Sequence, residues 1–118
     1  MIVFVDLTCD LTRSDLGQAM SNLANTYSEL GRHQDALVLK EKTLEFFRRV
    51  LPENHPDIGT SCFNLSLSYR QAGDSHRAIE RAREALRIFQ AALPPSHPHV
   101  KVAQKLVRQL EGNIARRA

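Results

Sequence analysis

Apolar residues recur along this chain at spacings of three and four, which is the spacing of one face of an α-helix. The stripe in residues 16–30 consists of Leu16, Ala19, Met20, Leu23, Ala24, Tyr27 and Leu30. The stripe in residues 36–51 consists of Ala36, Leu37, Leu39, Thr43, Leu44, Phe47 and Leu51. The pattern therefore predicts two amphipathic helices that bury these stripes against neighbouring elements.

Capping residues stand where these helices should begin and end. Asp15 is suited to cap the start of the first helix, and Gly31 can end it in a left-handed conformation. Pro52 and the following Asn-His-Pro at 54–56 should end the second helix, because proline lacks an N–H donor and restricts the residue before it.

The whole pattern repeats after 42 residues. Residues 15–56 and 57–98 share 13 identical positions, where ordinary composition gives roughly two or three. The identities include the tyrosine pair Tyr27 and Tyr69, the glycine pair Gly31 and Gly73, and a Leu-Pro-x-x-His-Pro junction. A fifth helix is expected at residues 100–115.

Short turns between such helices force antiparallel pairs, and identical pairs in tandem must stack. The expected fold is therefore all-α: a right-handed α-α superhelix with two full repeats and a C-terminal capping helix. Small residues at Ala24, Ala36, Ser66 and Ala78 should mark the closest helix approaches, with the two tyrosines filling the wider part of the joint. The expected division is an N-terminal segment at 1–14, repeats at 15–56 and 57–98, and the cap at 99–118.

Residues 1–14 fit two alternatives. Moved by one period, Ile2, Val5 and Cys9 align with the apolar stripe of a second helix, which favours the end of a preceding helix. The run Ile-Val-Phe-Val at 2–5 would equally suit a short strand. A chain that opens in mid-repeat is expected to be part of a longer array.

These residues resemble the tetratricopeptide repeat. Its signature appears as Leu23-Ala24, Tyr27, Gly31 and Ala36, and again at the corresponding positions one period later. The 42-residue unit and the Leu-Pro-x-x-His-Pro junction are similar to the kinesin light chain subclass. The resemblance implies a superhelical solenoid whose concave groove binds acidic or aromatic-containing linear motifs of cargo or adaptor proteins.

Composition adds a charge asymmetry to this picture. The net charge of +3 combines seven Lys and Arg against nine Asp and Glu in residues 1–73 with nine against four in residues 74–118. A basic half can attract an acidic partner, and it is also what solvated helix faces look like. The two cysteines show no framework spacing and favour a reducing compartment, so a cytoplasmic location is expected. The longest apolar stretch, at 2–5, is too short to span a membrane.

Catalytic and metal-binding patterns are absent from the sequence. The five histidines, His33, His55, His76, His97 and His99, all fall in predicted turns, where a repeated junction explains them better than a metal site does. Cys62 lies on an apolar helix face as a buried structural thiol would. We expect no enzyme activity, no cofactor and no metal.

The remaining candidate is a surface lined by the first helices of each pair, which form the concave side in stacked repeats. The candidate groove residues are Asn22, Asn25, Asn64, Arg70, Lys101, Lys105 and Arg108. An amide side chain can satisfy both the N–H and the C=O of an extended peptide, although it can equally bond a neighbouring helix. The basic residues would suit an acidic partner.

The sequence thus predicts a non-catalytic protein-interaction module that binds a short, acidic peptide segment. The alternative is a self-assembling element whose open repeat ends stack with copies of itself. The apolar N-terminal residues 1–12 also predict a symmetric homodimer. Nucleic acid is disfavoured as a partner, because no tryptophan and few aromatics accompany the basic faces.

Overall fold

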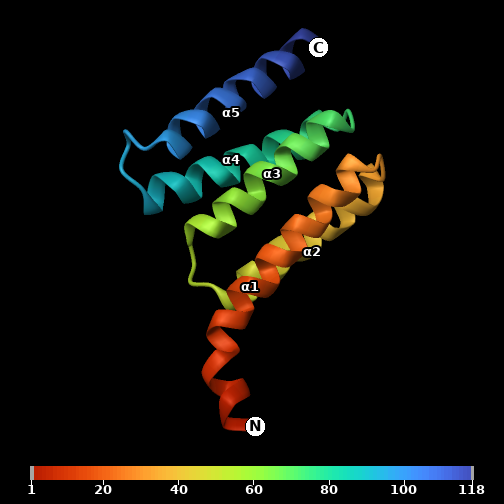
Figure 1. Ribbon diagram of the computed structural model, residues 1–118. Coiled ribbons are helices and arrows are strands. Elements are labelled where there is room, and N and C mark those ends of the chain that lie inside the picture. The colour runs from red at the N-terminus through yellow and green to blue at the C-terminus, as the bar shows by residue number, and fades with distance from the viewer. Residues whose placement is uncertain (1, 118) are drawn as a thin grey trace. The chain divides into compact units, whose positions relative to one another are not determined.

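The computed structural model describes the backbone of residues 2–117 and the side chains of residues 15–116. Regular structure within this range consists of five helices: α1 (Ile2–Glu29), α2 (His33–Val50), α3 (Pro56–Gln71), α4 (Ser75–Ala92) and α5 (Pro98–Arg117) (Figure 1). They form two compact units, Met1–Val50 with α1 and α2, and Leu51–Ala118 with α3, α4 and α5. The predicted all-α class and the helix ends near Gly31, Pro52, Gly73 and Pro94 are confirmed.

Both helical pairs turn through the same hydrogen-bonded motif. In the first, Gly31 has a φ of 81°, and its N–H donates to the Ser28 carbonyl at 3.1 Å while the Arg32 N–H donates to the Tyr27 carbonyl at 2.8 Å. Gly73 has a φ of 85°, and the bonds after α3 repeat one period later. These bonds satisfy carbonyls at the end of the helix, and the left-handed residue between them favours glycine. The turn is therefore encoded locally in each repeat.

A glycine in the first helix of each pair packs under a phenylalanine of the second. A Cβ built on Gly59 would lie 2.7 Å from Cε1 of Phe89, and one built on Gly17 would clash with the Phe47 ring. Phe47 and Phe89 are buried, with 4 % and 3 % exposed. The aromatic ring thus occupies the space that any larger side chain would need, and the helices approach closely at this point.

A second close approach lies nearer the turn. Ala24, Ala36, Ser66 and Ala78 are all at most 1 % exposed, as the small-residue pattern predicts. The Ser66 hydroxyl donates to the Ala78 carbonyl at 2.7 Å, which joins α3 to α4 inside the core. Of the two tyrosines, Tyr69 is buried and Tyr27 is half-buried.

The helix α1 begins earlier than the sequence predicts. Its backbone is helical from Ile2, so Asp15 lies inside the helix and does not cap it. In the second repeat a His-Pro pair precedes Asp57 and sets the start of α3, whereas residues 1–16 contain neither proline nor glycine to interrupt a helix. The strand interpretation of residues 2–5 and the helix start at Asp15 are therefore wrong.

One face of α1 is exposed, against the expectation of a fully buried stripe. Leu16, Leu23 and Leu30 are 52 %, 47 % and 69 % exposed. Two periods later, Val100 and Val107 of α5 occupy the positions of Leu16 and Leu23 and are 1 % and 8 % exposed. In α5 this face packs on α4, the preceding second helix. Within the described part of the chain no second helix precedes α1, and its leucines meet solvent.

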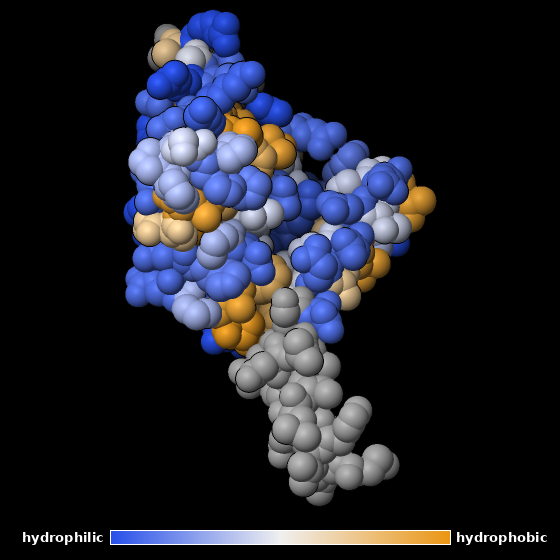
Figure 2. Space-filling model, turned by 60° about the vertical axis from the view of Figure 1, so that its left-hand side comes forward, coloured by the Kyte–Doolittle hydropathy of each residue, from blue (hydrophilic) through white to orange (hydrophobic). Residues whose placement is uncertain are grey.

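Most of the surface seen in Figure 2 is hydrophilic, and the hydrophobic side chains that reach it gather in small separate patches. Scattered apolar groups of this kind are ordinary on folded proteins, because polar residues cannot cover the whole surface. An exposed apolar group therefore needs an explanation only where several such groups share one helix face, as the leucines of α1 do.

Polar side chains that are buried in the second unit have hydrogen-bonding or ionic partners. Cys62 is fully buried, as predicted, and its Sγ donates to Oε1 of Glu84 at 3.0 Å. Glu84 in turn lies 3.7 Å from the guanidinium of Arg81. The thiol therefore helps to hold α3 against α4. The predicted role of Cys9 lies outside the described side chains.

Replacing Gly59 by alanine should lower the free energy of unfolding by about 1–3 kcal/mol, because the buried Phe89 ring must move to admit the methyl group. Gly112 is the matched control: it lies inside α5 and a Cβ there meets no atom within 4 Å. Gly112→Ala should raise stability by up to about 1 kcal/mol, since alanine is the better helix former. Urea unfolding of both variants checks the pair, and equal shifts would contradict the close approach.

Candidate peptide-binding surface

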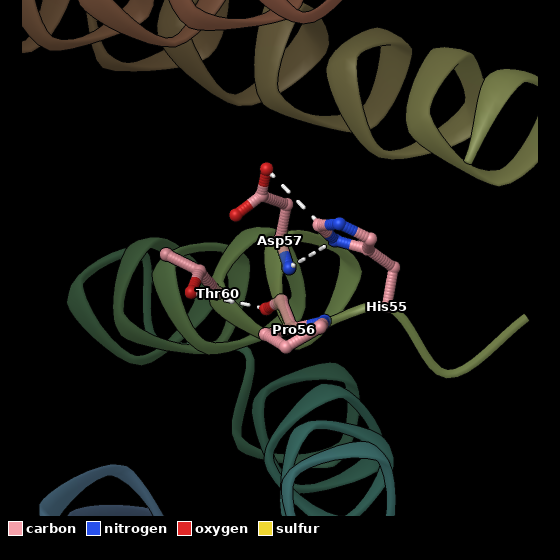
Figure 3. Close-up of polar contacts among 4 residues, drawn as sticks. All are labelled: His55, Pro56, Asp57 and Thr60. Atoms are coloured by element: carbon pink, nitrogen blue, oxygen red, sulfur yellow. Dashed lines mark hydrogen bonds and ion pairs between the residues drawn. The ribbon is translucent and has the colours of Figure 1, made fainter. Parts of the chain in front are cut away.

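Histidines set the starts of the two helices that carry the candidate surface. The Nδ1 atom of His55 accepts a hydrogen bond from the Asp57 N–H at 3.0 Å, and Pro56 takes the first helical position (Figure 3). One period later, Nδ1 of His97 accepts from the His99 N–H at 3.1 Å at the start of α5. The Asp57 carboxylate lies 3.9 Å from the same Nδ1 atom. The recurring histidines are helix caps, as the junction interpretation predicted.

A small apolar pocket lies among the three helices of the second unit. It has a volume of about 150 Å³ and is lined by Thr60, Phe63, Phe89, His99 and Val102. Phe89 is buried, while the Val102 side chain at the opening is 49 % exposed. An enclosed apolar cavity of about 150 Å³ is large enough for benzene. The pocket therefore has room for the ring or the branched end of one side chain.

Aromatic rings in tilted and edge-to-face contact form one wall of this pocket. The His99 ring lies 5.3 Å from that of Phe89, centroid to centroid, and 4.8 Å from that of His97. Aromatic pairs at such distances stabilise one another beyond the area they bury. The His97 cap thus also supports the ring of His99, and the pocket is held in shape by the start of α5.

The structure brings some of the predicted groove residues together and leaves others apart. Asn64 and Arg70 lie on α3, with Asn64 half-buried and Arg70 exposed. Lys101, Lys105 and Arg108 are exposed on α5. Asn22 and Asn25 are exposed on α1, which belongs to the other unit. The pocket unit thus contains five of the seven predicted residues, and none of the seven lines the pocket itself.

The three basic residues of α5 share one broad face, because Lys105 follows Lys101 by four positions and precedes Arg108 by three. Shifted by 42 residues, Lys101 takes the position of Gly59 and Arg108 that of Ser66, both of which face α4 in their own repeat. Lys101 and Arg108 therefore lie toward the side of α5 that would meet a following second helix. Lys105 lies between them and the pocket residue Val102, which it follows by three positions.

Arg70 lies on the pocket side of α3. It follows Phe63 by seven positions, which is nearly two helical turns, so both residues point to the same side. Of the predicted cations, Arg70 thus lies on the pocket side of α3, and Lys105 is the one on α5 whose position is nearest to Val102. The other basic residues of the predicted set stay a prediction.

Most pocket residues were not among the predicted groove residues. His99 was assigned only to a turn. Thr60 and Val102 occupy equivalent positions one period apart. That equivalence was the one sequence signal that could have identified them, since it marks the same face on consecutive first helices.

Charges outside the pocket are mostly engaged in surface pairs. Arg83 of α4 lies 3.6 Å from Glu111 of α5, and Arg77 lies 3.6 Å from the capping Asp74. Exposed pairs of this kind contribute little to stability.

Burial lowers the pKa of Lys40 on α2 below its usual value. In the described range, no three His, Cys, Asp or Glu side chains are grouped to hold a metal, and none of the helices there combines the length and the apolar character that a membrane span requires.

Comparison with known proteins identifies the repeat. The sequence model of the family described as tetratricopeptide repeat matches residues 15–91, which is more than half of the chain. A crystal structure of nearly identical TPR-like repeats from Podosopora anserina, assigned to a kinesin light chain, matches with a TM-score of 0.73 at 22 % identity. The crystal structure of a point variant of the same protein matches with a TM-score of 0.74 at 22 % identity. Each match covers 84 % of this chain and 47 % of the other, so the chain spans about half the length of these structures. None of the curated proteins matches this sequence.

Removing the His55 cap should destabilise the start of α3. His55→Ala is expected to lower the free energy of unfolding by about 1 kcal/mol, as the loss of a helix cap does. His55→Asn keeps a side-chain acceptor and should retain most of that stability. The exposed His76 is the control, because its position follows the capping Asp74 and does not itself cap α4. Thermal unfolding of the three variants checks this prediction, and equal melting temperatures for His55→Ala and His76→Ala would contradict the capping role of His55.

Proposed function

Because this chain belongs to the tetratricopeptide repeat family, we propose that it is a non-catalytic protein-interaction module that binds a short acidic peptide anchored by one apolar side chain. Repeats of this family generally serve as scaffolds that contact other proteins. The observation that carries the proposal is the apolar pocket between α3, α4 and α5 with its two neighbouring cations. The cytoplasmic location stays a prediction from the sequence.

The anchor of the peptide is an aromatic or branched aliphatic side chain. The pocket walls offer the rings of Phe63, Phe89 and His99, and its volume of about 150 Å³ admits a single such group. Its floor is part of the hydrophobic core, because Phe89 is only 3 % exposed. A preformed floor reduces the ordering cost of binding. The peptide therefore gains most of its binding energy at one position.

The flanking residues of the peptide are acidic. Arg70 on α3 and Lys105 on α5 are both exposed and lie on the pocket side of their helices. Long basic side chains can reach carboxylates on either side of the anchor, and such charges mainly raise the association rate and set the partner. Asn64, half-buried on α3, is proposed to bond the peptide backbone. The peptide contacts of Asn22 and Asn25, which belong to the other unit, stay a prediction from the sequence.

A fluorescent peptide with one central aromatic residue between glutamates should bind with a Kd in the micromolar range, about −8 kcal/mol. Adding salt should weaken the binding of this peptide, because exposed charges are screened. Val102→Glu places a carboxylate at the opening of the pocket and should abolish measurable binding without unfolding the chain, since Val102 is 49 % exposed. The matched control is Val38→Glu, at a valine that is 52 % exposed on α2.

A second comparison tests which of the basic residues contribute to peptide binding. The double variant Arg70→Ala with Lys105→Ala should weaken peptide binding about tenfold at low salt. Lys101→Ala with Arg108→Ala removes the same net charge from positions that lie further around α5 from the pocket and should weaken binding less. Fluorescence anisotropy titrations measure both. Equal losses in both double variants would show that net charge, and not the pocket, recruits the peptide.

A further inference from the structure

The exposed apolar residues of α1 share one helix face. Leu16, Leu23 and Leu30 are spaced by seven residues, and the exposed Ala19 and Thr26 lie between them. We refer to these five residues as the α1 stripe. The other large hydrophobic side chains that are exposed within the described range are single valines on α2 and α5. The α1 stripe is therefore the main concentration of exposed apolar side chains in that range, and such a concentration marks a contact surface.

The internal repeat shows which kind of element covers this face. Two periods later, the first three positions of the stripe are taken by Val100, Ala103 and Val107 of α5, all of which are buried. The helix that packs on α5 is α4, the second helix of the pair before it. A second helix of the repeat thus covers this face in the second unit, whereas the same face is exposed on α1.

An ion pair between α4 and α5 marks the face that α4 turns toward α5. The guanidinium of Arg83 lies 3.6 Å from the Glu111 carboxylate. Ile79 precedes Arg83 by four positions and Leu86 follows it by three, so all three lie on that side of α4. Ile79 and the intervening Ala82 are buried there, and Leu86 is half-buried. A helix suited to the α1 stripe therefore presents two branched aliphatic side chains seven residues apart with a small residue between them.

The length and the charge of the α1 stripe also agree with such a helix. The 15 residues from Leu16 to Leu30 span about 22 Å, and a second helix of 18 residues reaches about 27 Å, which is enough to cover them. Residues 15–30 carry two charged side chains, Asp15 and Glu29, both acidic and exposed. The sequence of α4 contains four arginines against two glutamates. The two helices therefore have opposite net charge, which favours their association.

From this we infer that the α1 stripe is a docking surface for an amphipathic helix of a partner protein, one with the chemistry that α4 presents to α5. Its branched aliphatic side chains cover the three leucines, and removing this apolar surface from water drives the association. Its small residue allows close approach at Ala19, and basic residues along its edges face Asp15 and Glu29. The homodimer predicted through residues 1–12 involves side chains outside the described range and stays a prediction from the sequence.

A fluorescent peptide with the sequence of residues 75–92 tests the docking, because this helix covers the equivalent face of α5. Anisotropy titration should show saturable binding of this peptide to the 118-residue chain. Leu23→Glu, at the centre of the α1 stripe, should raise the Kd by about tenfold or more. Val38→Glu is the matched control and should bind as the parent does, since Val38 is as exposed as Leu16, at 52 % each. A second peptide, in which glutamate replaces the residues at 79 and 86, should not bind.

The variant Val102→Glu separates this inference from the proposed function, because the pocket lies in the other unit and its loss should leave the docking of this helix unchanged. Circular dichroism of Leu23→Glu checks that its helices are retained, so that loss of binding is not loss of the fold.

Three outcomes overturn the inference. The first is the absence of binding at millimolar peptide concentration. The second is a peptide whose binding Val102→Glu or Val38→Glu weakens as much as Leu23→Glu does, which would place the peptide elsewhere on the chain. The third is a chain whose mass in sedimentation doubles from 13.3 kDa through Leu23 while the peptide fails to compete, which would assign the α1 stripe to a second copy.

Discussion

The contact on which both helical pairs depend is a phenylalanine ring seated on a glycine of the preceding helix. At Gly59 the ring of Phe89 occupies the place of a side chain, so α3 and α4 approach closely along their length. The same contact joins Gly17 and Phe47 one period earlier. Phe89 also forms the floor of the pocket, which means that the candidate binding surface is supported by the core itself. Because protein interiors are packed as densely as organic crystals, a shift of the Phe89 ring in the core would also change the shape of the pocket.

The helices α1 and α5 present faces of different chemistry. Where the repeat continues, small residues face the next second helix, as Gly59 and Ser66 do. In α5 the corresponding positions carry lysine and arginine, so this face interacts with water. On α1 the face that would meet a preceding second helix keeps its leucines. The face of α5 that would meet a following second helix is thus charged, whereas the face of α1 that would meet a preceding one is apolar.

The candidate site could be predicted only in part from the sequence. The basic residues were identified because helical periodicity shows which residues share a face. The place of Phe89 at the pocket was not predicted, since periodicity cannot distinguish a fully covered ring from one with an edge at a pocket. The pocket itself required the packing of α5 on α3 and α4, which brings His99 and Val102 together with Thr60 and Phe63.

Local interactions determined the helix ends near Gly31, Pro52 and Gly73 and the repeated His-Pro junction, and for that reason the sequence alone was sufficient for them. Hydrogen bonds such as those around Gly31 or His55 join residues a few positions apart, and residue type decides them. Burial is different, because it depends on whether a neighbouring element exists. Leu23 and Val107 occupy equivalent positions in equivalent stripes, yet one is 47 % exposed and the other 8 %. Only the tertiary structure could decide this, since α4 covers α5 while no described helix covers the same face of α1.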